Sequence, residues 1–443
     1  MAYLQNTLRI ALAAVTLASV PLTLVGPAVL RAEEALDVVE LSGEYAALIE
    51  EAPAPLDESA LFAPAEEWSA PLAEVAAAAT PVPTVVPSPT PQPAAAPAPT
   101  AAPLPTTLRA PGHFIYGAVL ADPKGSVNAA RAAGLTHVSA FVPWQNVEPS
   151  KGRYLFKEKE SWGAPVANDL TNVVEAARAA NLKVVLRLDE PPAWAGGKMY
   201  RLDPADVERY VYEAVSYGKG TITHVEVFNE PNLPFEWGTA PVDPAGYVRL
   251  LVAANRGAKR ADPGVSVISA AISPRTGGYG GTMEDVDFLD AIYKAGAKGH
   301  FDLLGIHAYL GNFAPEAPSE CVPMCLRTLE LLRAVMERNG DAAKGAYVTE
   351  IGVLQSTPQD LGAYEWMEVP AEQRAENLVK GLHVLNAAYP WVRGANVFNL
   401  DYAVVPWVPA TSPMHWFSLL NPDRSPRPAY NRIKDARATG QLP

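Results

Sequence analysis

The chain has 443 residues, of which 49% are hydrophobic, so it can hold one large domain or two to three average ones. Its net charge of −13 is unevenly placed, because residues 1–112 hold twelve acidic side chains and only three Arg. No basic stripe indicates nucleic-acid binding, and the mildly acidic remainder suits a neutral substrate better than a polyanion.

The N-terminal end contains an apolar run. Residues 10–30 carry no charge and lie between Arg9 and Arg31. The run is long for a signal-peptide core and just long enough to span a bilayer, although two prolines and a glycine weaken it as a helix. We expect residues 1–32 to be either a cleaved signal peptide or an uncleaved membrane anchor. Both alternatives predict an extracellular or cell-surface location, and the second adds a membrane tether.

Two low-complexity segments follow and together make up residues 33–111. Residues 33–79 are acidic and Ala-rich, a composition that disfavours a packed core. Residues 80–111 are rich in Pro, Ala and Thr, and frequent proline favours an extended polyproline-II spacer. We expect residues 33–111 to form a disordered linker that acts as a stalk.

From His113 onward, short apolar runs alternate with amphipathic segments. The runs are rich in Val and Ile, which favours strands buried on both faces. They cover residues 114–120, 137–144, 183–188, 224–230, 265–272, 301–309, 346–353 and 395–400. Helical patterns lie near residues 125–133, 166–180, 204–217, 244–261, 284–296, 326–338, 371–388 and 427–437, and two of them begin with Asp-Pro.

This alternation predicts the fold class. Eight strand–helix units over residues 112–443 predict an α/β protein with a (β/α)8 barrel, the TIM barrel. A doubly wound parallel sheet is the alternative, but no Gly-rich phosphate-binding loop follows the first strand. We therefore expect one barrel domain behind the N-terminal stalk.

A glutamate ends two of the predicted strands. Glu230 closes the fourth run, between Asn229 and Pro231, and Glu350 closes the seventh. Catalytic groups of such barrels lie at the C-terminal ends of strands, and a carboxylate at the end of a buried strand is costly unless it is paired or used. Strands four and seven can direct side chains across the same mouth. The pair therefore suits glycoside hydrolysis by two carboxylates.

These residues resemble the signature of clan A glycoside hydrolases, and the pattern is most like that of family 5 cellulase-like and family 39 xylosidase-like members. The resemblance covers residues 113–435. It includes the segment 144–154 after the second strand, the pair His307 and Tyr309 on the sixth, and the closing segment 417–430. It implies a barrel that binds a carbohydrate substrate and hydrolyses its O-glycosidic bonds without a metal or an organic cofactor.

The resemblance also implies roles for single residues. Glu230 would be the general acid/base and Glu350 the nucleophile of a retaining enzyme. Ionised Glu350 would raise the pKa of Glu230, as an acid at near-neutral pH requires. Asn229 would bind the sugar 2-hydroxyl, Tyr309 would orient the nucleophile, and His307 would line the pocket.

Further candidate contacts come from residues near other strand ends. Arg187 would neutralise a catalytic carboxylate or bind a hydroxyl, or simply pair with Asp189. Trp144, Trp194 and Trp407 fall in or near predicted strand-end loops, where a ring can stack on a sugar. We expect at least two aromatic platforms among the tryptophans of these loops.

The pattern departs from the family at the eighth strand. Relatives often have Trp at its end, where this chain has Phe398, so Trp407 or Trp416 would have to substitute from the loop. Two acidic residues are interpreted as structural. Glu148 belongs to a turn after the second strand, and Glu226 lies within the fourth, where it would be buried and paired.

The chain has two cysteines, Cys321 and Cys325. Outside the cytosol we expect them to form a local disulfide, with two buried thiols as the alternative. A metal site is not expected, because Cys ligands to a metal usually come as a set of four and no His cluster is near this pair.

The leading hypothesis is a secreted or surface-tethered retaining β-glycosidase that acts on poly- or oligosaccharides by double displacement. The alternative is a glycan-binding barrel without activity on a cell-surface stalk, although a binder would have no need of both Glu230 and Glu350. A third hypothesis is a cell-envelope structural protein in which the stalk is the main functional part.

Overall fold

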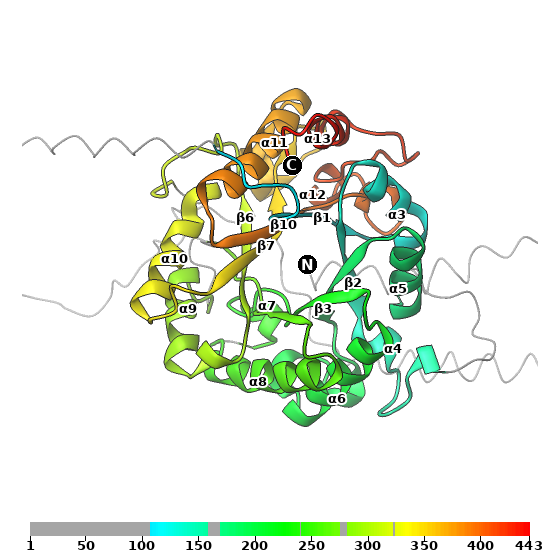
Figure 1. Cartoon of the computed structure of the whole chain (residues 1–443), viewed down its shortest axis with the longest axis vertical. Coiled ribbons are helices and arrows are strands. Elements are labelled where there is room, and N and C mark those ends of the chain that lie inside the picture. Colours follow the sequence, from blue (N-terminus) through cyan, green and yellow to red (C-terminus); the bar gives the residue numbers. More distant parts are fainter. Residues whose placement is uncertain (1–106, 158–168, 240, 275–280, 322–323) are drawn as a thin grey trace, which may run out of the picture. The chain divides into compact units, whose positions relative to one another are not determined.

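The structure is a computed structural model that describes residues 107–157, 169–239, 241–274, 281–321 and 324–443. Within these residues, parallel strands in the order β1-β10-β7-β6-β5-β4-β3-β2 close on themselves into a barrel that helices surround (Figure 1). The predicted (β/α)8 barrel is confirmed and the doubly wound sheet is excluded. The expectations for residues 1–32 and for the stalk up to residue 106 lie outside the described residues.

The barrel strands agree with the predicted runs to within a few residues at most ends. They are β1 (Ile115–Leu120), β2 (His137–Pro143), β3 (Lys183–Asp189), β4 (Ile222–Glu226), β5 (Ser266–Ile268), β6 (Leu303–Tyr309), β7 (Gly345–Gly352) and β10 (Val392–Val397). A separate two-stranded sheet, which was not predicted, joins β8 (Leu354–Gln355) to β9 (Glu368–Val369).

Long helices follow the strands as predicted. They are α3 (Pro123–Ala132), α5 (Leu170–Ala179), α6 (Pro204–Tyr217), α8 (Pro244–Ala261), α9 (Asp285–Lys294), α10 (Leu329–Arg338), α11 (Ala371–Ala388) and α13 (Pro428–Ala438). Three short helices that were not predicted lie in loops after strands, namely α4 (Trp144–Val147), α7 (Pro234–Trp237) and α12 (Pro413–Trp416). Across the described residues, no helix is both long and apolar enough to cross a membrane.

Charged side chains mark the two ends of the helices. Asp122, Asp169 and Asp203 precede α3, α5 and α6, and each side chain accepts a hydrogen bond from a backbone N–H of the first turn. The last turns carry cations instead, namely Arg131, Arg178, Lys259, Arg260, Lys294, Arg338 and Arg437. This distribution suits the helix dipole, which favours anions at the N-terminus and cations at the C-terminus.

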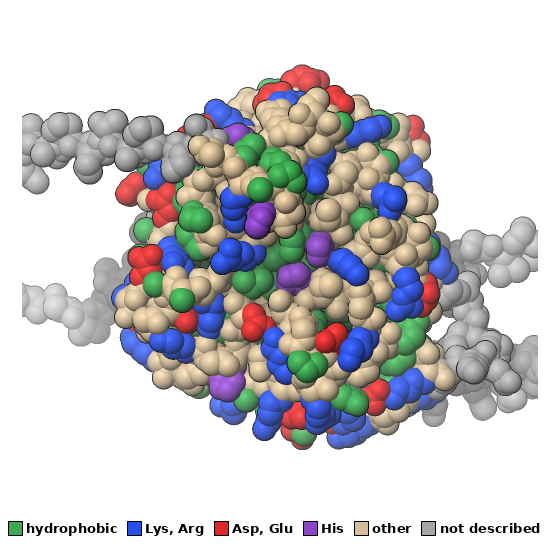
Figure 2. Space-filling view, viewed as in Figure 1, with side chains coloured by type: hydrophobic (Ala, Val, Ile, Leu, Met, Phe, Trp, Pro, Cys, Tyr) green, Lys and Arg blue, Asp and Glu red, His purple; other side chains and the backbone are tan. Residues whose placement is uncertain are grey.

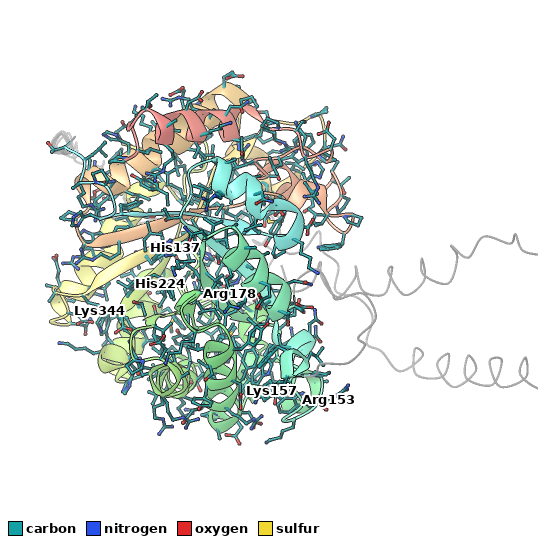
Figure 3. All side chains as sticks on the ribbon, turned by 45° about the vertical axis from the view of Figure 1, so that its right-hand side comes forward. His137, Arg153, Lys157, Arg178, His224 and Lys344 are labelled. Atoms are coloured by element: carbon teal, nitrogen blue, oxygen red, sulfur yellow. A yellow bond between two sulfur atoms is a disulfide. The ribbon has the colours of Figure 1, made fainter. Side chains whose placement is uncertain are left out.

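The starts of the strands lie at one end of the barrel, where the preceding helices end. In Figure 3, His137 marks the start of β2, Lys344 the residue before β7, and His224 lies in β4. Many Lys and Arg side chains surround the face seen in Figure 2. The opposite end, where strands finish and helices begin, is the end at which a barrel of this kind carries its site.

The interior of the barrel is filled with apolar side chains below that end. Val185, Ile268, Leu303 and Tyr347, from four different strands, form a buried cluster against which Ile115 packs. Polar side chains enter the interior nearer the C-terminal ends of the strands, where they form the candidate site.

Candidate active site

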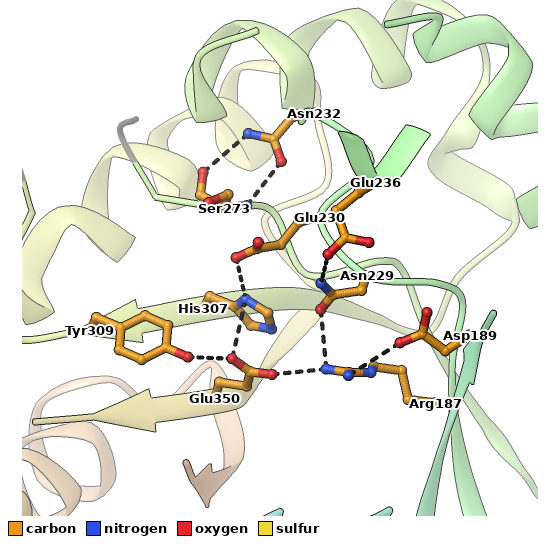
Figure 4. A network of polar contacts seen from close by, with 10 residues as sticks. All are labelled: Arg187, Asp189, Asn229, Glu230, Asn232, Glu236, Ser273, His307, Tyr309 and Glu350. Atoms are coloured by element: carbon orange, nitrogen blue, oxygen red, sulfur yellow. Dashed lines mark hydrogen bonds and ion pairs between the residues drawn. The ribbon is translucent and has the colours of Figure 1, made fainter. Parts of the chain in front are cut away.

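Ionisable and polar side chains from β3, β4, β6 and β7 meet at the C-terminal end of the barrel (Figure 4). Arg187 comes from β3, and Glu230 from the loop that follows β4. His307 and Tyr309 come from β6, and Glu350 from β7. The structure thus brings together residues that lie up to 163 positions apart in the chain.

Three side chains approach the carboxylate of Glu350. Arg187 Nη1 donates to Oε1 at 2.8 Å, and the hydroxyl of Tyr309 donates to Oε2 at 2.5 Å. His307 Nδ1 lies 3.6 Å from the same Oε2. Only 1% of the Glu350 residue is exposed, so these donors replace the water that an ionised carboxylate would otherwise need.

The direction of the Glu350 side chain depends on an irregularity in the β6–β7 ladder. Ile306 pairs with Val348, but His307 pairs with Glu350, so Thr349 is an extra residue on β7. A bulge of this kind turns the residues next to it to a different face. Here it places Glu350 beside His307 at the end of the barrel.

Glu230 is held by its backbone and by one side chain. Its N–H donates to the carbonyl of Ala271 at 3.0 Å, and Oε1 lies 2.7 Å from His307 Nδ1. The backbone is strained here, because Phe228 and Glu230 have φ angles of 70° and 38°. Residues other than Gly rarely adopt a positive φ, and backbone strain of this kind concentrates at functional sites.

The protonation of Glu230 differs from the expectation. Burial raises the pKa of this carboxyl, but the hydrogen bond and the charge of His307 outweigh burial and bring the pKa below its usual value. His307 is the counterpart: burial lowers its pKa, and the charges of Glu350 and Glu230 raise it to about 9. The expected rise in the pKa of Glu230 is therefore wrong for this state, because an imidazolium lies between the two carboxylates.

Arg187 connects the nucleophile candidate to the loop after β4. Besides Glu350, its Nη1 donates to Asn229 Oδ1 at 3.1 Å, and its Nη2 lies 3.2 Å from Asp189 Oδ2. Arg187 therefore neutralises Glu350 and also pairs with Asp189, two contacts that were expected as alternatives. Asn229 Nδ2 in turn donates to Glu236 Oε1 at 2.9 Å.

Three residues near the site were not predicted. Asn232 is completely buried, and its amide bonds the backbone of Ser273 and Met283, which fixes the loop after Glu230. Glu236 lies on α7. Burial raises the pKa of Tyr402, while the nearby charges of Arg187 and Glu350 lower and raise it, respectively. The sequence contains little signal for them, because their positions depend on how the loops fold.

Glu226 is buried in the barrel on β4, the strand that precedes Glu230. Its strand position pairs with that of Arg187, and burial raises its pKa to about 7. The prediction that it is buried is correct, but Oε1 has no hydrogen-bond partner among the described residues. Glu148 is structural as predicted, since it accepts hydrogen bonds from Trp144, Gly152 and Arg209.

Two of the three tryptophans that were expected to stack on a sugar pack around Glu148 in the structure. Trp144 is 1% exposed, stacks on Tyr210 and donates its indole N–H to Glu148. Trp194 meets Trp144 edge to face and donates to the carbonyl of Glu148 at 2.9 Å. Because Trp144 is buried and supports the turn that contains Glu148, we correct its assignment from substrate binding to structural packing. Trp194 is half-buried, so its role as a platform stays a prediction.

The eighth strand ends in an aromatic cluster without an exposed platform. Phe398 is fully buried and meets the rings of Tyr309 and Phe417 edge to face. Trp407 is half-buried in the following loop, and its role as a platform stays a prediction. The indole of Trp416 donates to the carbonyl of Ala410, and Arg427 lies over its ring.

Cys321 and Cys325 are joined by a disulfide, with their Cα atoms 6.1 Å apart. They lie in the loop between β6 and α10, away from the carboxylates described above. In the part of the chain that the structure describes, no three His, Cys, Asp or Glu side chains are grouped in a way that could hold a metal ion.

Known proteins match this chain in structure, but no sequence comparison finds a match. No protein-family model and no curated protein matches the sequence. Among solved structures, a family 39 glycoside hydrolase from the gut symbiont Bacteroides cellulosilyticus WH2 aligns with a TM-score of 0.56 at 21% identity, over 74% of this chain and 64% of that chain. The barrel therefore shares its fold with this glycoside hydrolase.

Two other structures agree with this likeness. A glucosidase from Croceicoccus marinus aligns with a TM-score of 0.52 at 17% identity, over 74% of this chain and 67% of that chain. A family 39 β-xylosidase from Caulobacter crescentus aligns with a TM-score of 0.50 at 16% identity, over 75% and 73% of the two chains. At these identities the likeness shows the fold, and activity has to be argued from the site.

Proposed function

We propose that the protein is a retaining β-glycosidase that hydrolyses O-glycosidic bonds of poly- or oligosaccharides. The observation that carries the proposal is the pair of buried carboxylates, Glu230 and Glu350, on either side of His307 Nδ1. They project from strand ends at the mouth of a barrel that resembles those of known glycoside hydrolases.

The separation of the carboxylates supports retention. His307 Nδ1 lies 2.7 Å from one oxygen of Glu230 and 3.6 Å from one oxygen of Glu350. These two oxygens can be no farther apart than the sum of both distances, about 6.3 Å, whereas inverting enzymes need roughly 6.5–9.5 Å between their carboxyl groups. This bound on one pair of oxygens is compatible with the separation of roughly 5–5.5 Å between the carboxyl groups of retaining enzymes.

Glu350 is suited to the role of nucleophile. Arg187 and Tyr309 each donate a hydrogen bond to one of its oxygens, and the carboxylate held in this way can attack the anomeric carbon and form a glycosyl-enzyme intermediate. As that bond forms, the carboxylate loses its negative charge. The donors therefore have to hold Glu350 in place without making it too weak a nucleophile.

Glu230 is suited to the role of acid/base through its contact with His307. In the resting site, protonated His307 donates from Nδ1 to the Glu230 carboxylate. Transfer of this proton to Glu230 would give the acid, and a substrate oxygen in the mouth would take the proton as the leaving group departs. The resulting carboxylate then removes a proton from the water that hydrolyses the intermediate. Asn229, held by Arg187, would donate to the sugar 2-hydroxyl in both steps.

We also propose that the enzyme acts outside the cytoplasm, secreted or tethered to the membrane. The support comes from the sequence, namely the apolar run at residues 10–30 and the Pro-rich stalk that follows it. A stalk would hold the mouth of the barrel at a distance from a surface that carries the polysaccharide.

The direct test is hydrolysis of a panel of aryl β-glycosides and β-linked polysaccharides by the full chain. Glu350→Ala and Glu230→Ala should each lower kcat by a factor of at least about 10³, because each removes one of the two groups that make or break the bond. Folding of each variant is checked by circular dichroism and thermal melting.

No turnover by the wild-type chain on any substrate, together with glycan binding that both variants keep, would contradict the proposal. That outcome would favour the glycan-binding barrel instead.

A further inference from the structure

Glu236 lies next to the residue assigned to the sugar 2-hydroxyl. It belongs to α7, six positions after Glu230, and Oε1 accepts a hydrogen bond of 2.9 Å from Asn229 Nδ2 (Figure 4). The residue is half-buried, so its carboxylate is not sealed in the core. Burial and the charge of Asp189 raise its pKa to about 7.

The Asn229 amide is held from both of its polar ends within the protein. Arg187 Nη1 donates to Oδ1 at 3.1 Å, and one N–H of Nδ2 is donated to Glu236. An amide has two N–H groups, so one remains for a ligand. Arg187 can only donate and therefore faces the amide oxygen, whereas Glu236 accepts and faces the amide nitrogen. These two contacts together fix the orientation of the Asn229 amide.

We propose that Glu236 is a positioning residue that fixes Asn229 with its free N–H toward the substituent on C2 of the sugar, and that it makes this subsite specific for a 2-hydroxyl. The inference rests on the proposed glycosidase function and defines the substrate class of the same site.

A hydroxyl on C2 fits this arrangement because it can both accept and donate a hydrogen bond. Its oxygen accepts the free N–H of Asn229, and its hydrogen can be donated to a neighbouring carboxylate, either Glu236 or Glu350. An acetamido group on C2 is bulkier than a hydroxyl, so a subsite shaped by Asn229 and Glu236 around a hydroxyl would discriminate against it by size.

The test combines enzyme variants with modified substrates. Three aryl β-glycosides of the sugar that the wild-type chain hydrolyses best are compared, with one common leaving group: the 2-hydroxy, 2-deoxy and 2-acetamido forms. The wild type should hydrolyse the 2-acetamido form at least about 100-fold more slowly, by kcat/KM, than the 2-hydroxy form.

Glu236→Ala removes the acceptor and should lower kcat/KM for the 2-hydroxy substrate by about 10- to 100-fold, as expected when a hydrogen bond involving a charged group is lost. The same variant should act on the 2-deoxy substrate within about threefold of the wild type, because the interaction it supports is absent there. Glu236→Gln keeps an acceptor for Asn229 and should restore part of the activity.

The matched control is Glu190→Gln. This carboxylate follows β3 near the same end of the barrel and bonds Gln145, so its loss lowers the local negative charge without touching Asn229. The control should act on all three substrates like the wild type.

If Glu236→Ala lost the same factor of kcat/KM on the 2-hydroxy and the 2-deoxy substrates, the inference would be overturned, because a general disturbance of the loop affects both substrates alike. Equal turnover of the 2-acetamido form by the wild type would also overturn it. A wild-type chain inactive on every glycoside would instead contradict the glycosidase proposal and remove the inference with it.

Discussion

His307 sets the proton balance between the two candidate catalytic carboxylates. Its Nδ1 is 2.7 Å from Glu230 and 3.6 Å from Glu350, while its Nε2 is buried without a partner among the described residues. Burial raises the pKa of Glu230, but the hydrogen bond and the charge of His307 outweigh burial and lower this pKa. The residue that holds the acid in place therefore also limits the pH range in which it carries a proton.

This balance predicts the pH dependence of His307→Asn. Without the imidazolium, burial is no longer outweighed, so the pKa of Glu230 rises and the acid keeps its proton to higher pH. The basic limb of the kcat/KM profile should move upward by about one pH unit or more, while kcat falls because the carboxylates lose their common partner.

His300→Asn, a half-buried histidine just before β6, serves as the control and should leave the profile unchanged. A basic limb that stays in place or moves to lower pH in His307→Asn would contradict this account of the pair.

For single residues, the sequence was enough to predict the two candidate catalytic carboxylates but not the contacts of several other side chains. Glu230 and Glu350 could be predicted because each ends an apolar run. A charged group at the end of a buried strand is costly unless it is paired or has a function. Trp144 was misassigned because its burial depends on Tyr210, a residue 66 positions away that no local pattern connects to it. The hydrogen bond of Glu236 likewise depends on the loop geometry after β4.

At the scale of elements, the contact between β5 and β6 is the one on which the position of Glu230 depends. Ile268 and Leu303 form the registered pair of this contact, and the side chain of Ser269 accepts the N–H of Gly305 at 3.0 Å. Ala271, just beyond β5, accepts the N–H of Glu230. Movement of β5 would therefore move the acid/base candidate.

Gly305→Ala should separate these strands. A Cβ at this position would lie 2.4 Å from the carbonyl oxygen of Ser269 and 2.8 Å from the nitrogen of Ala271, both of them backbone atoms that cannot turn aside. We expect a loss of stability of about 1–3 kcal/mol, seen as a lower melting temperature, and a lower kcat.

Gly299→Ala is the matched control, since no atom lies within 4 Å of a Cβ built there. If both variants melted together with the wild type, the close packing of β5 on β6 would not be essential.

The elements themselves were largely predictable. Helices such as α6 and α8 start at an Asp-Pro pair that defines their first turn, and their observed bounds equal the predicted ones. The fifth run was predicted as residues 265–272, but β5 is only Ser266–Ile268, because a serine side chain replaces a backbone partner. The short helices α7 and α12 lack enough residues to show a helical period.

For the whole molecule, a buried acid below the site makes stability depend on pH. Glu226 has a pKa of about 7 in the folded protein, compared with an ordinary value of 4.5, and burial is the largest cause. Between these two values the folded state binds more protons than the unfolded state, so stability falls as the pH rises through this window. The penalty is complete above pH 7.

Glu226→Gln should remove this dependence. Relative to the wild type, the variant should gain roughly 3 kcal/mol in free energy of unfolding between pH 4 and pH 8, as expected for a shift of two to three pKa units. Melting temperatures of both proteins across this range provide the measurement. A constant difference between the two proteins at every pH would show that Glu226 does not titrate as described.

The most direct measurement for the central claim is capture of the glycosyl-enzyme intermediate. The full chain is incubated with an activated 2-deoxy-2-fluoro glycoside of the preferred sugar, digested, and its peptides are sequenced by mass spectrometry. The account predicts one added sugar, attached to Glu350, and no label on Glu350→Ala. A label on another residue, or hydrolysis with an inverted first product and no label, would contradict it.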